Sequence, residues 1–141
     1  MFSGNYIDKI RASFDFLVSE QGFISSSSSV QWDDSVVYKK KHLSIKVNVG
    51  DKDTFFNILV KTAGATKAVP LWAICRSEKL KTGALTGTCF DNENFAVYAE
   101  NSAEALRKLM PKLTKYGPVE QRKAKIEMQR NLKERIQIYG W

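Results

Sequence analysis

The chain of 141 residues carries 22 lysines and arginines against 15 aspartates and glutamates, for a net charge of +7, and 43% of its residues are hydrophobic. This length suits one domain over residues 1–141, and the apolar content excludes a wholly disordered chain. No apolar run approaches the ~20 residues that span a bilayer, and the N-terminus lacks the apolar core of a secretory signal, so we expect a cytoplasmic protein outside membranes.

The first expected element is a helix from Tyr6 to about Glu20, ended by Gly22 in a left-handed conformation. One arc of this helix collects the apolar side chains Tyr6, Ile7, Ile10, Phe14, Leu17 and Val18. Phe16 points away from that arc. An aromatic ring on a polar face can anchor a partner protein, and the alternative is that another segment of the same chain covers it.

Strands are expected next, after the serine run Ser25–Ser29, which we expect to be a flexible connection. From Val30 the apolar period changes to two, first over Val30, Trp32, Val36 and Tyr38 and then over Leu43, Ile45, Val47 and Val49. The charged turn Lys39–His42 separates these two strands, and Gly50–Asp53 precedes a third strand, Phe55–Val60. Because the loops are short, neighbouring strands should be antiparallel, with one sheet face packed and the other in water.

The middle of the chain gives weaker patterns. Val69–Cys75 is either a buried strand or the start of a helix, since periodicity does not separate the two in so short a run. Thr82–Gly87 is rich in glycine and threonine and is expected to be a loop. Thr88–Phe90 and Phe95–Ala99 flank four polar residues, which favours a further hairpin.

Two helices are expected at the C-terminus. Asn101 with Glu104 resembles a capping box, and the first helix should run from there to Gly117. Its apolar arc is Ala105, Leu106, Leu109, Met110, Leu113 and Tyr116. Pro111 should kink or split that helix, whereas Pro118 stands at a favourable first position of the second one. The stripe of the second helix is Ala124, Met128, Leu132, Ile136 and Tyr139.

These elements predict an α+β fold with an N-terminal helix, an antiparallel sheet of three to five strands and two C-terminal helices packed on the sheet. The helices should cover one face of the sheet. The core expected between them contains Ile10, Phe14, Trp32, Ile45, Val47, Leu109 and Leu132.

Most of the excess positive charge lies in residues 101–141, which hold ten basic and four acidic residues. The helical spacing places three basic side chains on one ridge of the first C-terminal helix and four on one side of the second. Such ridges can contact an acidic protein surface or a phosphate backbone, and the alternative is a solvated face of salt bridges. The candidate partner-binding residues are Lys108, Lys112, Lys115, Arg122, Lys123, Arg130 and Lys133, together with Phe16.

Residues for catalysis or metal binding are few. Cys75, Cys89 and His42 are far apart in sequence and lack metal-ligand spacing, so we expect no metal and no cofactor. His42 follows three lysines in a turn, which is an exposed position for a catalytic base. Asp33 and Asp34 are adjacent on a strand and should face opposite sides of the sheet. No residue in the chain argues for an enzyme.

Residues 14–60 resemble small bacterial proteins of the immunity-protein type. The resemblance rests on Phe16-Leu17, Gly22-Phe23, Val36-Val37-Tyr38, Leu43-Ser44-Ile45-Lys46-Val47 and Phe55–Val60. Immunity proteins of polymorphic toxin systems bind and block a cognate toxin, so the resemblance implies a protein partner. The chain departs from the pattern at Asp51-Lys52-Asp53, where the family has a basic and glycine-containing hairpin, and no functional residue is carried over.

Charge and resemblance together favour a non-catalytic protein-binding module, an immunity or accessory protein whose partner has an acidic surface. The alternative is a nucleic-acid-associated protein that uses the basic C-terminal helices. No helix-turn-helix or other nucleic-acid motif accompanies the charge.

Overall fold

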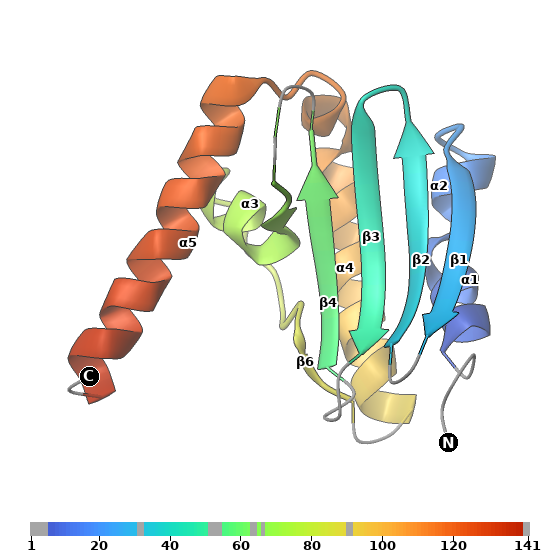
Figure 1. The fold of residues 1–141 in the computed structure, drawn as a ribbon, viewed down its shortest axis with the longest axis horizontal. Coiled ribbons are helices and arrows are strands. Elements are labelled where there is room, and N and C mark those ends of the chain that lie inside the picture. Colours follow the sequence, from blue (N-terminus) through green and yellow to red (C-terminus); the bar gives the residue numbers. More distant parts are fainter. Residues whose placement is uncertain are drawn as a thin grey trace.

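The computed structural model describes residues 6–30, 33–50, 55–62, 65, 67–89 and 92–139, with side chains from Asn94 to Arg130 in the last of these ranges. It has the predicted α+β architecture (Figure 1). The N-terminal half contains α1 (Ile7–Phe14), α2 (Phe16–Ser19), β1 (Ile24–Val30), β2 (Asp33–Lys40), β3 (Leu43–Gly50) and β4 (Phe55–Lys61). The remainder contains β5 (Val69–Pro70), α3 (Leu71–Ser77), β6 (Gly87–Thr88), α4 (Asn92–Leu113) and α5 (Pro118–Tyr139).

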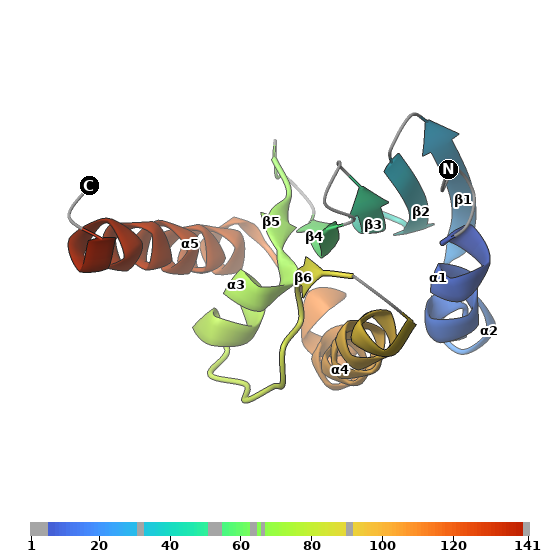
Figure 2. The same ribbon diagram turned by 90° about the horizontal axis from the view of Figure 1, so that it is seen from below.

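The described strands form one antiparallel sheet in the order β1-β2-β3-β4-β5, and β6 also pairs with β4. Three to five strands were expected, and the sheet has six because it includes two short strands, β5 and β6, of two residues each. The helices α1, α2 and α4 lie on one side of the sheet, and no described helix covers the other side (Figure 2). One face of the sheet therefore packs against helices and one is open.

The predicted N-terminal helix is broken once, at Asp15, into α1 and α2. Gly22 ends it as predicted, with a φ of 77°. The amide of Phe23 donates to the Leu17 carbonyl at 2.9 Å, which satisfies one of the last carbonyls of the helix.

The serine run forms a strand, so its prediction as a flexible connection was wrong. Ile24–Val30 pairs along its whole length with β2, from Ile24 opposite Lys39 to Val30 opposite Asp33. Backbone hydrogen bonds need no particular side chain, and the serines remain exposed or half-exposed. The strand therefore follows from its neighbour rather than from an apolar pattern of its own.

The alternation predicted for the next strands is confirmed. Along β3, Leu43, Ile45, Val47 and Val49 are buried, and the residues between them are half-buried. The register aligns Ile45 with Tyr38 on β2 and with Val60 on β4, so the buried side chains of three strands share the helical face.

The uncertain segment 69–75 is both a strand and a helix, because Val69–Pro70 pairs with β4 and α3 begins at Leu71.

The hairpin predicted around residues 88–99 was wrong, since α4 already begins at Asn92. Phe95, Ala99 and Leu106 are buried along one side of this helix, so the apolar stripe extends upstream of the predicted cap at Asn101.

The two prolines of the C-terminal region behave differently. Pro111 lies inside α4, in its last turn, and the helix continues to Leu113, so Pro111 does not split it. Pro118 begins α5 as predicted. Gly117 is not the end of α4 but belongs to the short connection before α5.

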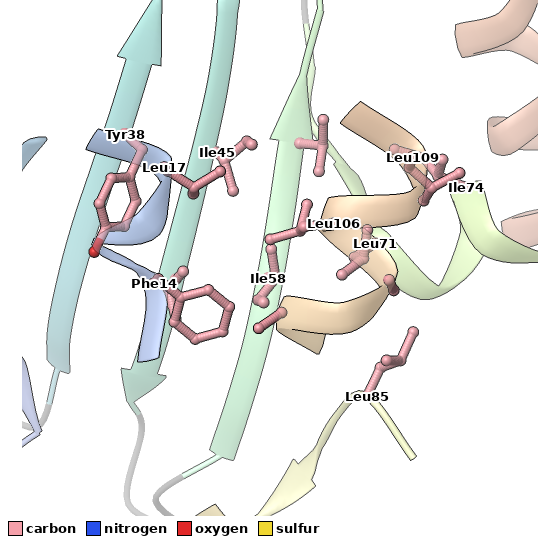
Figure 3. Packing of buried hydrophobic residues seen from close by; sticks show 14 of the residues in the cluster. Phe14, Leu17, Tyr38, Ile45, Ile58, Leu71, Ile74, Leu85, Leu106 and Leu109 are labelled. Carbon is pink, nitrogen blue, oxygen red and sulfur yellow. The ribbon is translucent and has the colours of Figure 1, made fainter. Parts of the chain in front are cut away.

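The core lies between the sheet and the helices (Figure 3). Leu106 of α4 points toward Ile58 of β4, and Phe14 and Leu17 point toward the sheet from the N-terminal helices. Complete burial of such a side chain contributes about 1.5–3 kcal/mol. Of the predicted core, Ile10, Phe14, Ile45, Val47 and Leu109 are at most 3% exposed, while Trp32 and Leu132 lie outside the described side chains.

The last helix, α5, packs by its first turns against α3 and β5 at the edge of the sheet. Ala124 of the predicted stripe is fully buried there. Val119 and Ile126 are 59% and 47% exposed, and the helix then extends away from the sheet in both views (Figures 1 and 2). No helix within the described residues has the length and apolar content to cross a membrane.

A candidate basic binding surface

Several of the C-terminal basic residues predicted to bind a partner are in ion pairs within the chain. Arg122 and Lys123 are exposed on α5, Lys115 is exposed in the connection before it, and the side chain of Lys133 lies outside the described residues. The ion pairs join Lys108 to Glu104 at 3.0 Å, Lys112 to Glu78 at 2.8 Å and Arg130 to Glu127 at 2.9 Å. These acids neutralise part of the ridges locally, so the ridges are less strongly positive than their sequence suggests.

Glu78 connects the end of α3 to the end of α4. Lys112 Nζ donates to one carboxylate oxygen at 2.8 Å and the Tyr116 hydroxyl donates to the other at 2.9 Å. The Lys112 hydrogen bond is the main cause that lowers the pKa of Glu78, and Lys123 adds to it by its charge. Burial raises the pKa of Tyr116 to about 12, so its hydroxyl stays protonated and donates. Lys112 is therefore paired with an acid of its own chain.

Phe16, the other predicted partner-binding residue, is 8% exposed. The Arg107 guanidinium lies 4.0 Å from the centre of its ring, in cation–π geometry, and is also 3.8 Å from Glu20. The ring is therefore covered by its own chain, as in the alternative we considered for it. It does not belong to an exposed patch.

Other basic side chains gather where the sequence indicated only a turn. The chain reverses between β2 and β3 at Lys41 and His42, and Lys41 adopts a φ of 54°. Lys39 lies opposite Ser44, and Ser44 lies opposite Lys61 on β4, so these three residues form one row across three strands. Residues directly opposite in a sheet have Cβ atoms about 5 Å apart, which brings Lys61 close to the turn. We call this group, Lys39, Lys40, Lys41, His42 and Lys61, the basic turn surface.

Two hollows lie against the basic turn surface, one on each side of the turn. The hollow on the helical side, about 340 Å³, is lined by Lys40, by Leu113 at the end of α4 and by Thr114 just after it. The hollow on the open side, about 380 Å³, is lined by Lys39, Ser44 and Lys61. Both share the lining residues Lys41, His42, Leu43 and Thr62.

The charges of this surface have no acid partner among the side chains that the structure describes, since none of its lysines is in an ion pair there. The Lys40 ammonium lies 5.9 Å from the centre of the Phe23 ring, a long cation–π contact. The buried hydroxyl of Thr62, which lines both hollows, donates to Gln121 Oε1 at 2.6 Å and so already has a partner within the chain. The surface therefore offers positive charge, and its chemistry suits a negatively charged partner.

The side chains that could carry out chemistry lie apart. Cys75 and Cys89 are buried, unbridged thiols, and burial raises the pKa of Cys75 to about 11, so its nucleophilic thiolate is scarce. Asp34 faces the core, where it accepts bonds from the Tyr6 amide and the Ser29 hydroxyl. No group of three or more His, Cys, Asp or Glu residues in the described part of the chain could hold a metal ion.

Sequence reasoning identified the lysines of the turn only as turn residues and did not connect them with Lys61. The signal that could have joined them is the strand register, since a two-residue turn after Lys40 places the end of β4 beside the turn.

No family model, curated protein or solved structure matches this chain. The resemblance of residues 14–60 to immunity-type proteins thus stays a prediction from the sequence.

Proposed function

We propose that this protein is a non-catalytic binding protein that contacts an acidic protein partner through the basic turn surface. The observation that supports this function is the convergence of four lysines from β2, the turn and β4 without an acid partner among the described side chains. Positive charge on one surface accelerates and orients the approach of an acidic surface. Blocking such a partner, as an immunity protein does, or scaffolding it would both use this contact.

A protein partner is favoured over nucleic acid by the extent of the charge. A phosphate backbone needs basic residues along a continuous track. Here the ridges of α4 and α5 that could extend such a track include the ion-paired Lys108, Lys112 and Arg130. The remaining cluster is compact and flanked by two hollows, which suits the carboxylate side chains of a protein surface.

The experiment is a pull-down of the tagged protein from its source cells, divided into nuclease-treated and untreated halves, with two charge-reversal variants. Lys39→Glu with Lys61→Glu reverses the surface, and both side chains are exposed. Arg122→Glu with Lys125→Glu is the matched control, because it reverses two exposed charges on α5.

We expect one protein to remain after nuclease treatment, to be captured at least about tenfold less by the first variant, and to be captured normally by the control. Its binding should also weaken as salt is raised. Equal capture by both variants would rule out the basic turn surface. If nuclease treatment removes the captured material, the partner is a nucleic acid instead.

A further inference from the structure

The outer edge of β1 has no strand partner among the residues that the structure describes. Among the described residues β1 pairs with β2 alone, and it lies at the end of the sheet (Figure 1). Its seven residues include no charge and no proline, and their pairing with β2 runs without a bulge. Natural edge strands are normally protected by such features, because unpaired N–H and C=O groups attract another strand. The absence of this protection on β1 suggests that the edge is used.

The side chains of β1 point to the same conclusion. The strand buries none of them fully, although Ile24 and Val30 at its two ends are apolar and are 78% and 57% exposed. Both lie on the open face of the sheet, because Ile24 is opposite the exposed Lys39 and residues separated by an even number along a strand share a face. An isolated serine strand gains little from one neighbour, so a second neighbour would stabilise it and cover these two side chains.

We propose that two copies of this chain join by antiparallel pairing of β1 with β1, around a twofold axis at Ser27. The strand reads Ile, five serines, Val, which is nearly the same pattern in both directions. In this register Ile24 of one copy lies opposite Val30 of the other, and each serine lies opposite a serine. A shift by one residue would place the apolar side chains on the wrong face, and a shift by two would place serine opposite one of them and leave the other beyond the end of the paired strand. The self-matching pattern therefore identifies a second copy as the occupant.

The surrounding elements leave room for this pairing. The helix α1 packs against β2 and α4, one strand inward from the edge. The described helices under this part of the sheet lie on its other face from Ile24 and Val30 (Figure 2). A twofold axis perpendicular to the sheet would extend it across both copies, with both helical layers on the same side. The basic turn surface, at the β2–β3 turn, would stay exposed in each copy.

The first test combines the oligomeric state with a cysteine at the axis. The wild-type protein is measured by sedimentation or light scattering over a concentration series, and a dimer is expected. Ser27→Cys should form a covalent dimer on oxidation or with a short bifunctional thiol reagent, since the two cysteines lie directly opposite. Ser25→Cys is the control, because its copies would be about 13 Å apart along the strands. The native Cys75 and Cys89 are buried and should not interfere.

The second test uses charge. Ser26 lies opposite Ser28 of the other copy, so Ser26→Lys with Ser28→Lys places like charges in contact and should give a monomer. Ser26→Glu with Ser28→Glu should do the same. Mixing the two variants should restore a dimer of one copy of each, which shows that repulsion rather than misfolding separated the copies.

Three results would overturn the proposal. One is a monomeric wild-type protein at every concentration reached. The second is a dimer in which Ser25→Cys crosslinks as well as Ser27→Cys, because that requires another register. The third is a pair of charged variants that remain dimeric when separate. None of these results bears on the acidic partner, which the basic turn variants test independently.

Discussion

Thr62 Oγ1 donates a hydrogen bond of 2.6 Å to Gln121 Oε1, which joins the residue after β4 to the first turn of α5. The two side chains are 3% and 8% exposed. Gln121 Nε2 in turn donates to the Lys67 carbonyl at 3.3 Å, so the amide is used on both sides. Thr62 also lines both hollows, so the contact that holds α5 lies next to the basic turn surface.

Thr62→Val should therefore lower the free energy of unfolding by about 1–3 kcal/mol, because it keeps the shape of the side chain and leaves the buried Gln121 oxygen without its donor. Chemical denaturation measures this change. Gln121→Leu and the double variant complete a cycle, in which the double variant should lose less stability than the sum of the single ones. Additive losses would show that the bond contributes nothing to stability.

Gly22→Ala should destabilise the protein by about 1 kcal/mol, because a Cβ is unfavourable at the φ of 77°. Apart from Gly22 and its two chain neighbours, no residue has an atom within 4 Å of the position of that Cβ, so the cost is backbone strain alone. Gly117→Ala is the matched control, since its Cβ would meet Glu120 Oε2 at an ordinary 3.6 Å. Thermal denaturation should show no loss for the control, and an equal loss in both variants would contradict the assignment of Gly22 as the helix stop.

Glu78→Gln should lower stability at neutral pH and have little effect in acid. The lowered pKa of Glu78 means that the folded state favours the carboxylate. Its stabilisation is present at pH values above the normal glutamate pKa and is lost as the pH falls through the lowered pKa of the folded state. We expect a loss of about 1 kcal/mol at pH 7, since the partner Lys112 is largely exposed.

Melting temperatures of wild type and Glu78→Gln across a pH series measure this effect. Glu104→Gln breaks the exposed pair with Lys108 and should change the melting temperature only slightly at any pH. A Glu78→Gln difference that persists unchanged at acidic pH would show that the carboxylate charge does not contribute.

Local features of the chain were predictable because they act between near neighbours in sequence. The 3.6-residue stripe of residues 6–20 and the two-residue alternation of Leu43–Val49 are properties of adjacent turns and pleats. Gly22 and Pro118 act on the backbone at their own positions. The α+β class, the antiparallel meander and most of the expected core follow from these signals.

Only the tertiary structure decided the elements and contacts that depend on distant partners. The serines of β1 carry no apolar pattern and become a strand because β2 offers its backbone groups. Lys112 binds Glu78, 34 positions away in sequence, so its charge is paired and not available to the predicted ridge. Lys61 lies near the turn because of the register of β2 with β3 and of β3 with β4. Strand pairing and ion pairing depend on where a partner lies in space, and the chain specifies that only once the core has packed.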